Sequence, residues 1–117
     1  MKKYMEIIAI KPEHAQEYIE LHNHPWPEML QAELEAGMKK EVIFFYNNMS
    51  IIYSECEDYE ECDRKLRATE VCKRWDALVK PWMEGSVMPP KVFAHEGTFA
   101  ASAKPPRSAL PEVSLPR

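Results

Sequence analysis

Short runs of apolar and β-branched residues along the chain predict β-strands. The first run, YMEIIAI at residues 4–10, ends at Lys11-Pro12. The runs EVIFFY at 41–46 and SIIYSEC at 50–56 are separated by Asn47-Asn48, and an asparagine-rich turn between two such runs is typical of a β-hairpin. A last run, KVFAHEG from residue 91, predicts the final strand.

Between these runs the apolar residues take helical spacing. A first helix is predicted from Pro12 to about residue 22, because Pro25 interrupts the pattern. A second starts near Pro27 and continues through EMLQAELEA to Gly37, a residue suited to the end of a helix. Two further helices are predicted after the hairpin, at residues 58–68 and 70–83.

The predicted order is strand, helices, strand, strand, helices, strand. This order is typical of an α+β, ferredoxin-like protomer, in which helices cover one face of the sheet. The other face commonly packs against a second copy, so fold analogy predicts a homodimer of the dimeric α/β barrel type. We expect one domain at residues 1–99. The segment 100–117, rich in Ala, Ser and Pro, is expected to be a flexible tail that could also cover a partner subunit.

Composition narrows the classes of partner. The chain has 117 residues, 45% hydrophobic and 29% charged, with a formal net charge of −4. Nucleic acid is excluded as a partner because no basic stripe is present, whereas a neutral ligand such as a sugar remains open. No run approaches the ~20 apolar residues of a membrane span. The three cysteines form no C-x-x-C pair, which favours a reducing cytoplasm over a disulfide framework or zinc knuckle.

The first helix carries the candidate chemistry. Tyr18 and His22 lie four residues apart on its apolar face, so their side chains lie one above the other. One interpretation places the tyrosine hydroxyl at the surface and lets the histidine cap the helix end. Another makes them an acid/base pair at the rim of a pocket. A third, metal binding by His22 and His24 with Glu28, has poor spacing, and no metal or cofactor is predicted.

Three tryptophans stand out in a chain of this length. Trp75 lies near the polar start of a helix, where an aromatic ring can line a pocket and stack on the C–H face of a sugar. Trp26 and Trp82 are interpreted as core residues, as is Cys72. The sequence has no glycine-rich phosphate loop and no G-x-S-x-G.

Three motifs together carry a resemblance. HNHPWPE at residues 22–28, TEVCKRW at 69–75 and KVFAH at 91–95 resemble the L-rhamnose mutarotase family. The resemblance implies a ferredoxin-like protomer in a dimeric barrel. It also implies cofactor-free interconversion of the α and β anomers of a pyranose, with His22 as the chief acid/base, Tyr18 as its partner and Trp75 as a wall of the sugar site.

The chain departs from the family pattern at two positions of the implied site. Glu41 stands where members carry a tyrosine, and Asp76 where they carry a second tryptophan. These carboxylates are expected to hydrogen-bond sugar hydroxyls or else to be exposed. The hypothesis is therefore an isomerase acting on L-rhamnose or a related 6-deoxy sugar. Its alternatives are an L-fucose mutarotase, a non-catalytic sugar-binding module, and a barrel enzyme of other chemistry such as an oxygenase.

Overall fold

A computed structural model describes residues 1–96 of the chain. It contains four strands, four α-helices and two short 3₁₀ turns. In chain order they are β1 (Lys2–Ile10), a 3₁₀ turn (Pro12–His14), α1 (Ala15–Asn23), α2 (Pro27–Ala36), β2 (Lys40–Tyr46), β3 (Met49–Cys56), α3 (Tyr59–Arg67), α4 (Glu70–Val79), a second 3₁₀ turn (Lys80–Trp82) and β4 (Met83–Val87). The expected domain end at 99 and the tail 100–117 lie outside the described residues.

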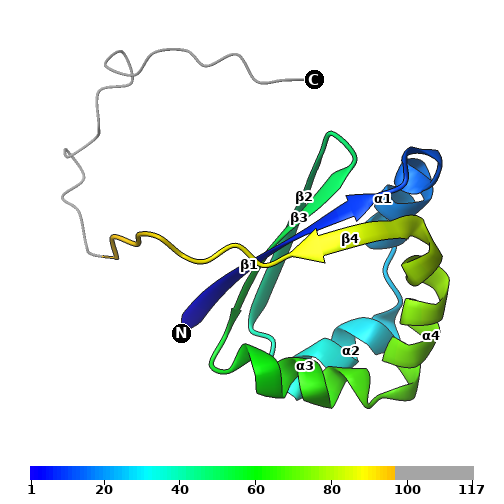
Figure 1. Cartoon of the computed structure of the whole chain (residues 1–117). Coiled ribbons are helices and arrows are strands. Elements are labelled where there is room, and N and C mark those ends of the chain that lie inside the picture. Colours follow the sequence, from blue (N-terminus) through cyan, green and yellow to red (C-terminus); the bar gives the residue numbers. More distant parts are fainter. Residues whose placement is uncertain (97–117) are drawn as a thin grey trace, which may run out of the picture.

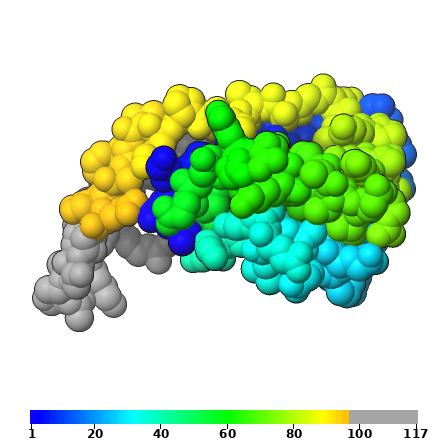
Figure 2. All heavy atoms as spheres, turned by 90° about the horizontal axis from the view of Figure 1, so that it is seen from below, coloured from blue at the N-terminus to red at the C-terminus, as the bar shows by residue number. Residues whose placement is uncertain are grey.

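The strands form one antiparallel sheet in the order β2-β3-β1-β4 (Figure 1). This is the strand order of the split β-α-β unit, which confirms the predicted α+β, ferredoxin-like protomer. Figure 2 views the helical layer, in which α2 packs beside α3 and α4. The β2–β3 hairpin turns at Asn47 and Asn48, both left-handed with φ of 52° and 58°, which asparagine tolerates well. Gly37 ends α2 with φ of 108°, as predicted.

The predicted final strand at residue 91 was wrong. The fourth strand is β4, which pairs with β1 from Ile10 opposite Met83 to Ile7 opposite Val87. Its sequence, MEGSV, has little β-character, and its place is set by the free edge of β1 rather than by its own residues. Residues 88–96 contain no helix or strand and run away from the sheet (Figure 1).

Alternation along the strands divides the sheet into two faces. On the face toward the helices, Ile8, Ile10 and Cys56 enter the core with the helical residues Cys72 and Val79. Cys56, Cys62 and Cys72 are all buried free thiols. Cys72 and Trp82 are core residues, as expected from the sequence.

The opposite face is bare of helices, as the fold analogy predicted. Phe44, Ile51, Ile7 and Val87 form one row across all four strands of that face. Phe44 is 64% exposed and Val87 57%, although both are apolar. No helix among residues 1–96 is both long and apolar enough to cross a membrane.

Candidate active site

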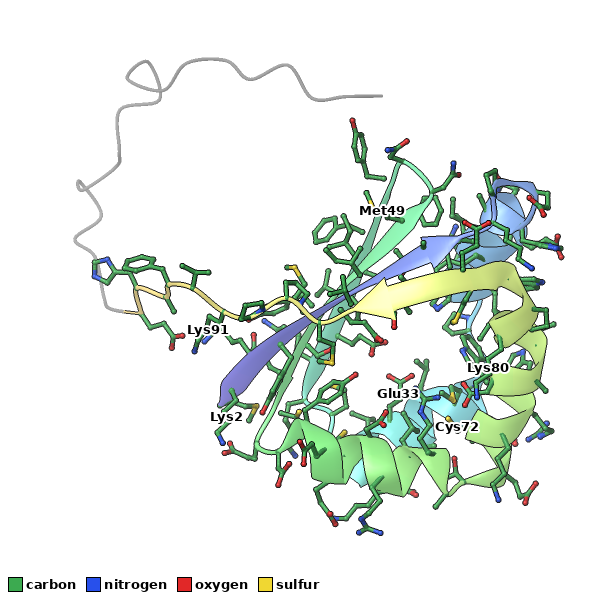
Figure 3. All side chains as sticks on the ribbon, viewed as in Figure 1. Lys2, Glu33, Met49, Cys72, Lys80 and Lys91 are labelled. Atoms are coloured by element: carbon green, nitrogen blue, oxygen red, sulfur yellow. The ribbon has the colours of Figure 1, made fainter. Side chains whose placement is uncertain are left out.

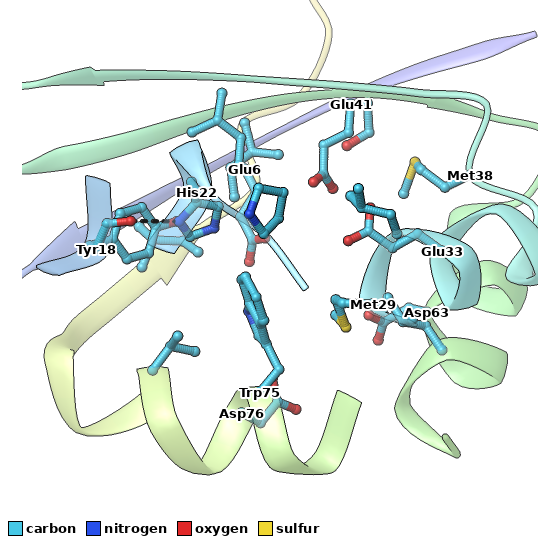
Figure 4. A pocket seen from close by; sticks show the side chains of 18 of the residues that line it. Glu6, Tyr18, His22, Met29, Glu33, Met38, Glu41, Asp63, Trp75 and Asp76 are labelled. Carbon is cyan, nitrogen blue, oxygen red and sulfur yellow. Dashed lines mark hydrogen bonds between the residues drawn. The ribbon is translucent and has the colours of Figure 1, made fainter. Parts of the chain in front are cut away.

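A cavity of about 410 Å³ lies between the sheet and the helices, a size typical of small-molecule sites. Its walls come from α1, α2, α3, α4 and the inward face of the sheet (Figure 4). All five site residues predicted from the sequence line this one cavity: Tyr18, His22, Glu41, Trp75 and Asp76. The fold therefore brings together residues that lie up to 58 positions apart in the chain (from 18 to 76).

Helix α1 places the side chains of Tyr18 and His22 next to each other. One turn of helix separates them, and their ring centroids are 4.2 Å apart. Tyr18 is 2% exposed, and its hydroxyl shares a hydrogen bond of 2.7 Å with Oγ of Ser50 on β3. The interpretation that placed this hydroxyl at the surface was therefore wrong. Burial raises the pKa of Tyr18, with the Ser50 hydrogen bond opposing, so the phenol keeps its proton at neutral pH.

His22 holds a defined tautomer. Its Nδ1 lies 2.8 Å from the backbone carbonyl oxygen of Tyr18. A carbonyl only accepts, so Nδ1–H donates, and Nε2 keeps a free lone pair. Burial lowers the pKa of His22 more than this hydrogen bond raises it, so the ring is neutral near pH 7. His22 bonds a carbonyl one turn back in its own helix, not one of the last four carbonyls of α1, so this bond is not the helix cap that one interpretation expected. The same bond leaves it able to accept a proton at a cavity wall.

Trp75 packs edge-on against two rings beside the cavity. Its centroid lies 5.4 Å from that of His22 and 5.1 Å from that of Trp26, both nearly perpendicular. Pro27 begins α2 immediately after Trp26, which fixes that ring at the junction of α1 and α2. Thr69 caps α4 by accepting the N–H of Cys72 at 3.2 Å, and so sets the turn from which Trp75 projects.

Asp76 lines the cavity but is already paired. Arg67 Nη1 donates to both of its carboxylate oxygens at 2.7 Å, and Arg67 Nε donates to Asp63 at 3.2 Å. The hydrogen bond with Asp76 raises the pKa of Arg67 against the opposing effect of burial. Asp76 therefore fixes a guanidinium at the wall. Burial raises the pKa of the neighbouring Cys72 thiol, which keeps it protonated and unreactive.

Glu41 faces the cavity from β2 beside two carboxylates that sequence reasoning missed, Glu6 on β1 and Glu33 on α2 (Figure 4). Glu41 is solvent-accessible because the cavity that it lines is partly open. Two signals in the sequence mark the missed residues. Glu6 alternates with Ile8 on the inward side of β1, and Glu33 lies one helical turn after the buried Met29. Figure 3 shows Glu33 pointing from α2 into the space under the sheet.

The remaining candidates lie elsewhere. Glu28 forms an ion pair with Arg74 at 2.9 Å, and no group of three His, Cys, Asp or Glu within residues 1–96 could hold a metal ion. His14 stacks on Trp82 with centroids 5.8 Å apart, away from the cavity lining. His95 is exposed and does not line the cavity.

Comparison with known proteins gives one family. A family model described as L-rhamnose mutarotase matches residues 3–106. An L-rhamnose mutarotase of Lachnoclostridium phytofermentans is 39% identical over 72 residues, which cover 60% of this chain and 68% of the relative. One of Bacillus subtilis is 35% identical over 86 residues, covering 72% and 82%.

Solved structures agree on the fold. An L-rhamnose mutarotase from Formosa agariphila superposes with a TM-score of 0.69 at 20% identity, over 82% of this chain and all of the other. An antibiotic biosynthesis monooxygenase superposes with a TM-score of 0.56 at 19% identity, over 79% of this chain and 99% of the other, so the fold alone is shared with that class. With the family match spanning the sheet, the helices and the cavity described above, this chain belongs to the L-rhamnose mutarotase family.

Proposed function

We propose that this chain is an aldose 1-epimerase that interconverts the α and β anomers of L-rhamnose or a related 6-deoxy sugar. The observation that carries the proposal is the neutral His22 on the wall of a partly enclosed cavity, held in one tautomer and in ring contact with Tyr18. Family membership supports it, since the relatives are named for L-rhamnose. Those names favour L-rhamnose over the L-fucose alternative.

The proposed reaction follows from the protonation states of His22, which is neutral, and Tyr18, which keeps its proton. Nε2 of His22 accepts the proton of the anomeric hydroxyl, the bond between C1 and the ring oxygen breaks, and the ring oxygen takes a proton from the Tyr18 phenol. Rotation about C1–C2 presents the other face of the aldehyde, and reclosure returns both protons. Each positioned proton transfer contributes about 10²–10⁴-fold. The order left open by the sequence is thus assigned to His22 first, because burial keeps Tyr18 protonated.

The other site residues are assigned to binding. Trp75 offers an apolar wall to the C–H face of the sugar. Glu41 accepts hydrogen bonds from sugar hydroxyls, and Asp76 acts by holding Arg67 at the cavity. A non-catalytic sugar-binding module remains the second candidate. It has no need of a neutral imidazole whose tautomer is fixed by its own helix.

The assembly and compartment are also proposals. The bare sheet face, with its apolar row from Phe44 to Val87, supports a homodimer in which this face covers its copy. Three buried free thiols support a reducing cytoplasm.

Magnetisation exchange between the α and β anomeric protons tests the activity by NMR, with L-rhamnose and L-fucose run side by side. We expect fast exchange on L-rhamnose with the wild-type chain and its loss in His22→Ala, with the oligomeric state unchanged. His14→Ala is the matched control, because it removes an imidazole outside the cavity. Full activity in His22→Ala would overturn the mechanism. No acceleration of either sugar would favour the binding module.

A further inference from the structure

One end of the cavity is lined by carboxylates that take no part in the proton transfers proposed above. Glu6, Glu33 and Glu41 approach it from three different elements, and Figure 4 shows the Glu33 and Glu41 carboxylates pointing toward each other from opposite walls. No hydrogen bond or ion pair joins Glu33 or Glu41 to any of residues 1–96. Glu33 is half-buried and Glu41 is solvent-accessible, so a ligand that displaces water from them must itself supply hydrogen-bond partners.

Among residues 1–96, little positive charge faces these carboxylates. Arg67 is the one Lys or Arg that lines it among residues 1–96, and Asp63 and Asp76 already bind that guanidinium. His22 is neutral at pH 7. Arg67 therefore offsets only part of the negative charge of Glu6 and Glu41.

Their electrostatics support this description. Burial, together with the charge of Glu41, raises the pKa of Glu33 to about 7. Burial and the charge of Glu6 raise the pKa of Glu41 against the opposing charge of Arg67. Burial also raises the pKa of Glu6, again with Arg67 opposing. A ligand that brings hydrogen-bond donors or positive charge to this end relieves the repulsion, and one that brings negative charge increases it.

We propose, resting on the function proposed above, that Glu33 and Glu41, together with Glu6, make this pocket select aldoses by charge. An aldose that carries an ammonium group in place of a hydroxyl binds better than its neutral parent, and an aldose that carries a carboxylate or phosphate is rejected. A hydroxyl offers these carboxylates one donor, whereas an ammonium offers three donors and a compensating charge. Because the cavity is partly enclosed, such pairs are weakly screened.

Inhibition of L-rhamnose anomer exchange by three sugars on one carbon frame tests this selection: D-galactosamine, D-galactose and D-galacturonate at pH 7. We expect the amine to inhibit at least about tenfold more strongly than the neutral sugar, and the uronate at least about tenfold more weakly, a factor of ten being about 1.4 kcal/mol. The double variant Glu33→Gln/Glu41→Gln keeps the side-chain shape and should make the three sugars inhibit about equally. Glu35→Gln, on the exposed side of the same helix, should leave the order intact.

Equal inhibition by the amine and the neutral sugar, or an order that survives in the double variant, would overturn the selection. Calorimetric titration of the same three sugars into both proteins separates this result from a failure of the proposed function. If L-rhamnose exchange is not accelerated but the amine still binds best and loses its advantage in the double variant, charge selection stands and the mutarotase activity falls. If L-rhamnose exchange is accelerated but the three sugars bind equally well, the mutarotase activity stands and charge selection is wrong. If the amine does not bind at all, charge selection is also wrong.

Discussion

At the scale of single residues, the tautomer of His22 is set by a carbonyl that any residue at position 18 would provide. The tyrosine adds a buried, protonated phenol directly against the imidazole. The chemistry at this helix end thus depends on a backbone acceptor as much as on the two side chains. The sequence predicted the pair from its i, i+4 spacing. It could not predict the protonation states of the two side chains, because these depend on burial and on Ser50 from a distant strand.

The pH dependence of exchange should report the His22 pKa. Burial lowers this pKa below 6.5, and only the neutral ring can accept the anomeric proton. We therefore expect kcat/KM to stay level from pH 8 down to pH 6.5 and to fall at lower pH as His22 becomes protonated. Exchange rates at a series of pH values, with the uncatalysed rate subtracted, provide the measurement. A fall that begins above pH 7 would contradict a neutral His22.

Glu33→Gln should stabilise the protein in alkaline solution. The folded-state pKa of Glu33, about 7, lies above its ordinary value of 4.5. The folded state therefore binds this proton more tightly, and the free energy of unfolding falls as pH rises from about 4.5 to 7. Glutamine cannot ionise, so we expect a gain of about 1–2 kcal/mol at pH 8, reduced by solvent in the cavity, and almost none at pH 4. Urea unfolding at the two pH values measures the difference, and an equal effect at both would show that Glu33 ionisation is not the cause.

At the scale of elements, the polar junction HNHPWPE is explained by what its two prolines do. Pro25 follows the last residues of α1, and Pro27 opens α2, so the chain turns within three residues and leaves Trp26 against Trp75. Elements with strong local signals were predictable: the Asn47-Asn48 hairpin, the Gly37 cap and the four helices. β4 was not, because its sequence is weak and the edge of β1 decides its place. Glu6 and Glu33 were missed for a similar reason, since only the packed fold shows that they face one cavity.

Thr69 joins two elements and is the clearest test of local stability. Its Oγ1 accepts the N–H of Cys72 at the start of α4 and donates to the carbonyl of Leu66 at 2.7 Å near the end of α3. Thr69→Ala should lower the free energy of unfolding by about 1 kcal/mol, and Thr69→Ser should retain most of it. Urea midpoints of the three proteins make the comparison. An alanine variant as stable as the wild type would show that the cap is not needed to hold the turn from which Trp75 projects.

At the scale of the whole molecule, the helices cover one face of the sheet and leave the other apolar and open (Figure 1). The cavity and this open face lie on opposite sides of a single sheet, so association and sugar chemistry can be changed separately. Phe44 lies in the row that crosses all four strands, next to Ile51 of β3. If a second copy covers this face, a charge at that position is buried without a partner at the interface.

Phe44→Asp should therefore convert the proposed dimer to a monomer, which light scattering after size-exclusion chromatography measures directly. Leu34→Asp is a close control: Leu34 is 61% exposed against 64% for Phe44, but it lies on α2 and outside the cavity lining. We expect Leu34→Asp to leave the mass of the dimer unchanged. If the Phe44 variant keeps the wild-type mass, or if the wild type is already a monomer, this face does not hold two copies together. If Phe44→Asp is monomeric and still accelerates anomer exchange, each protomer carries a complete site.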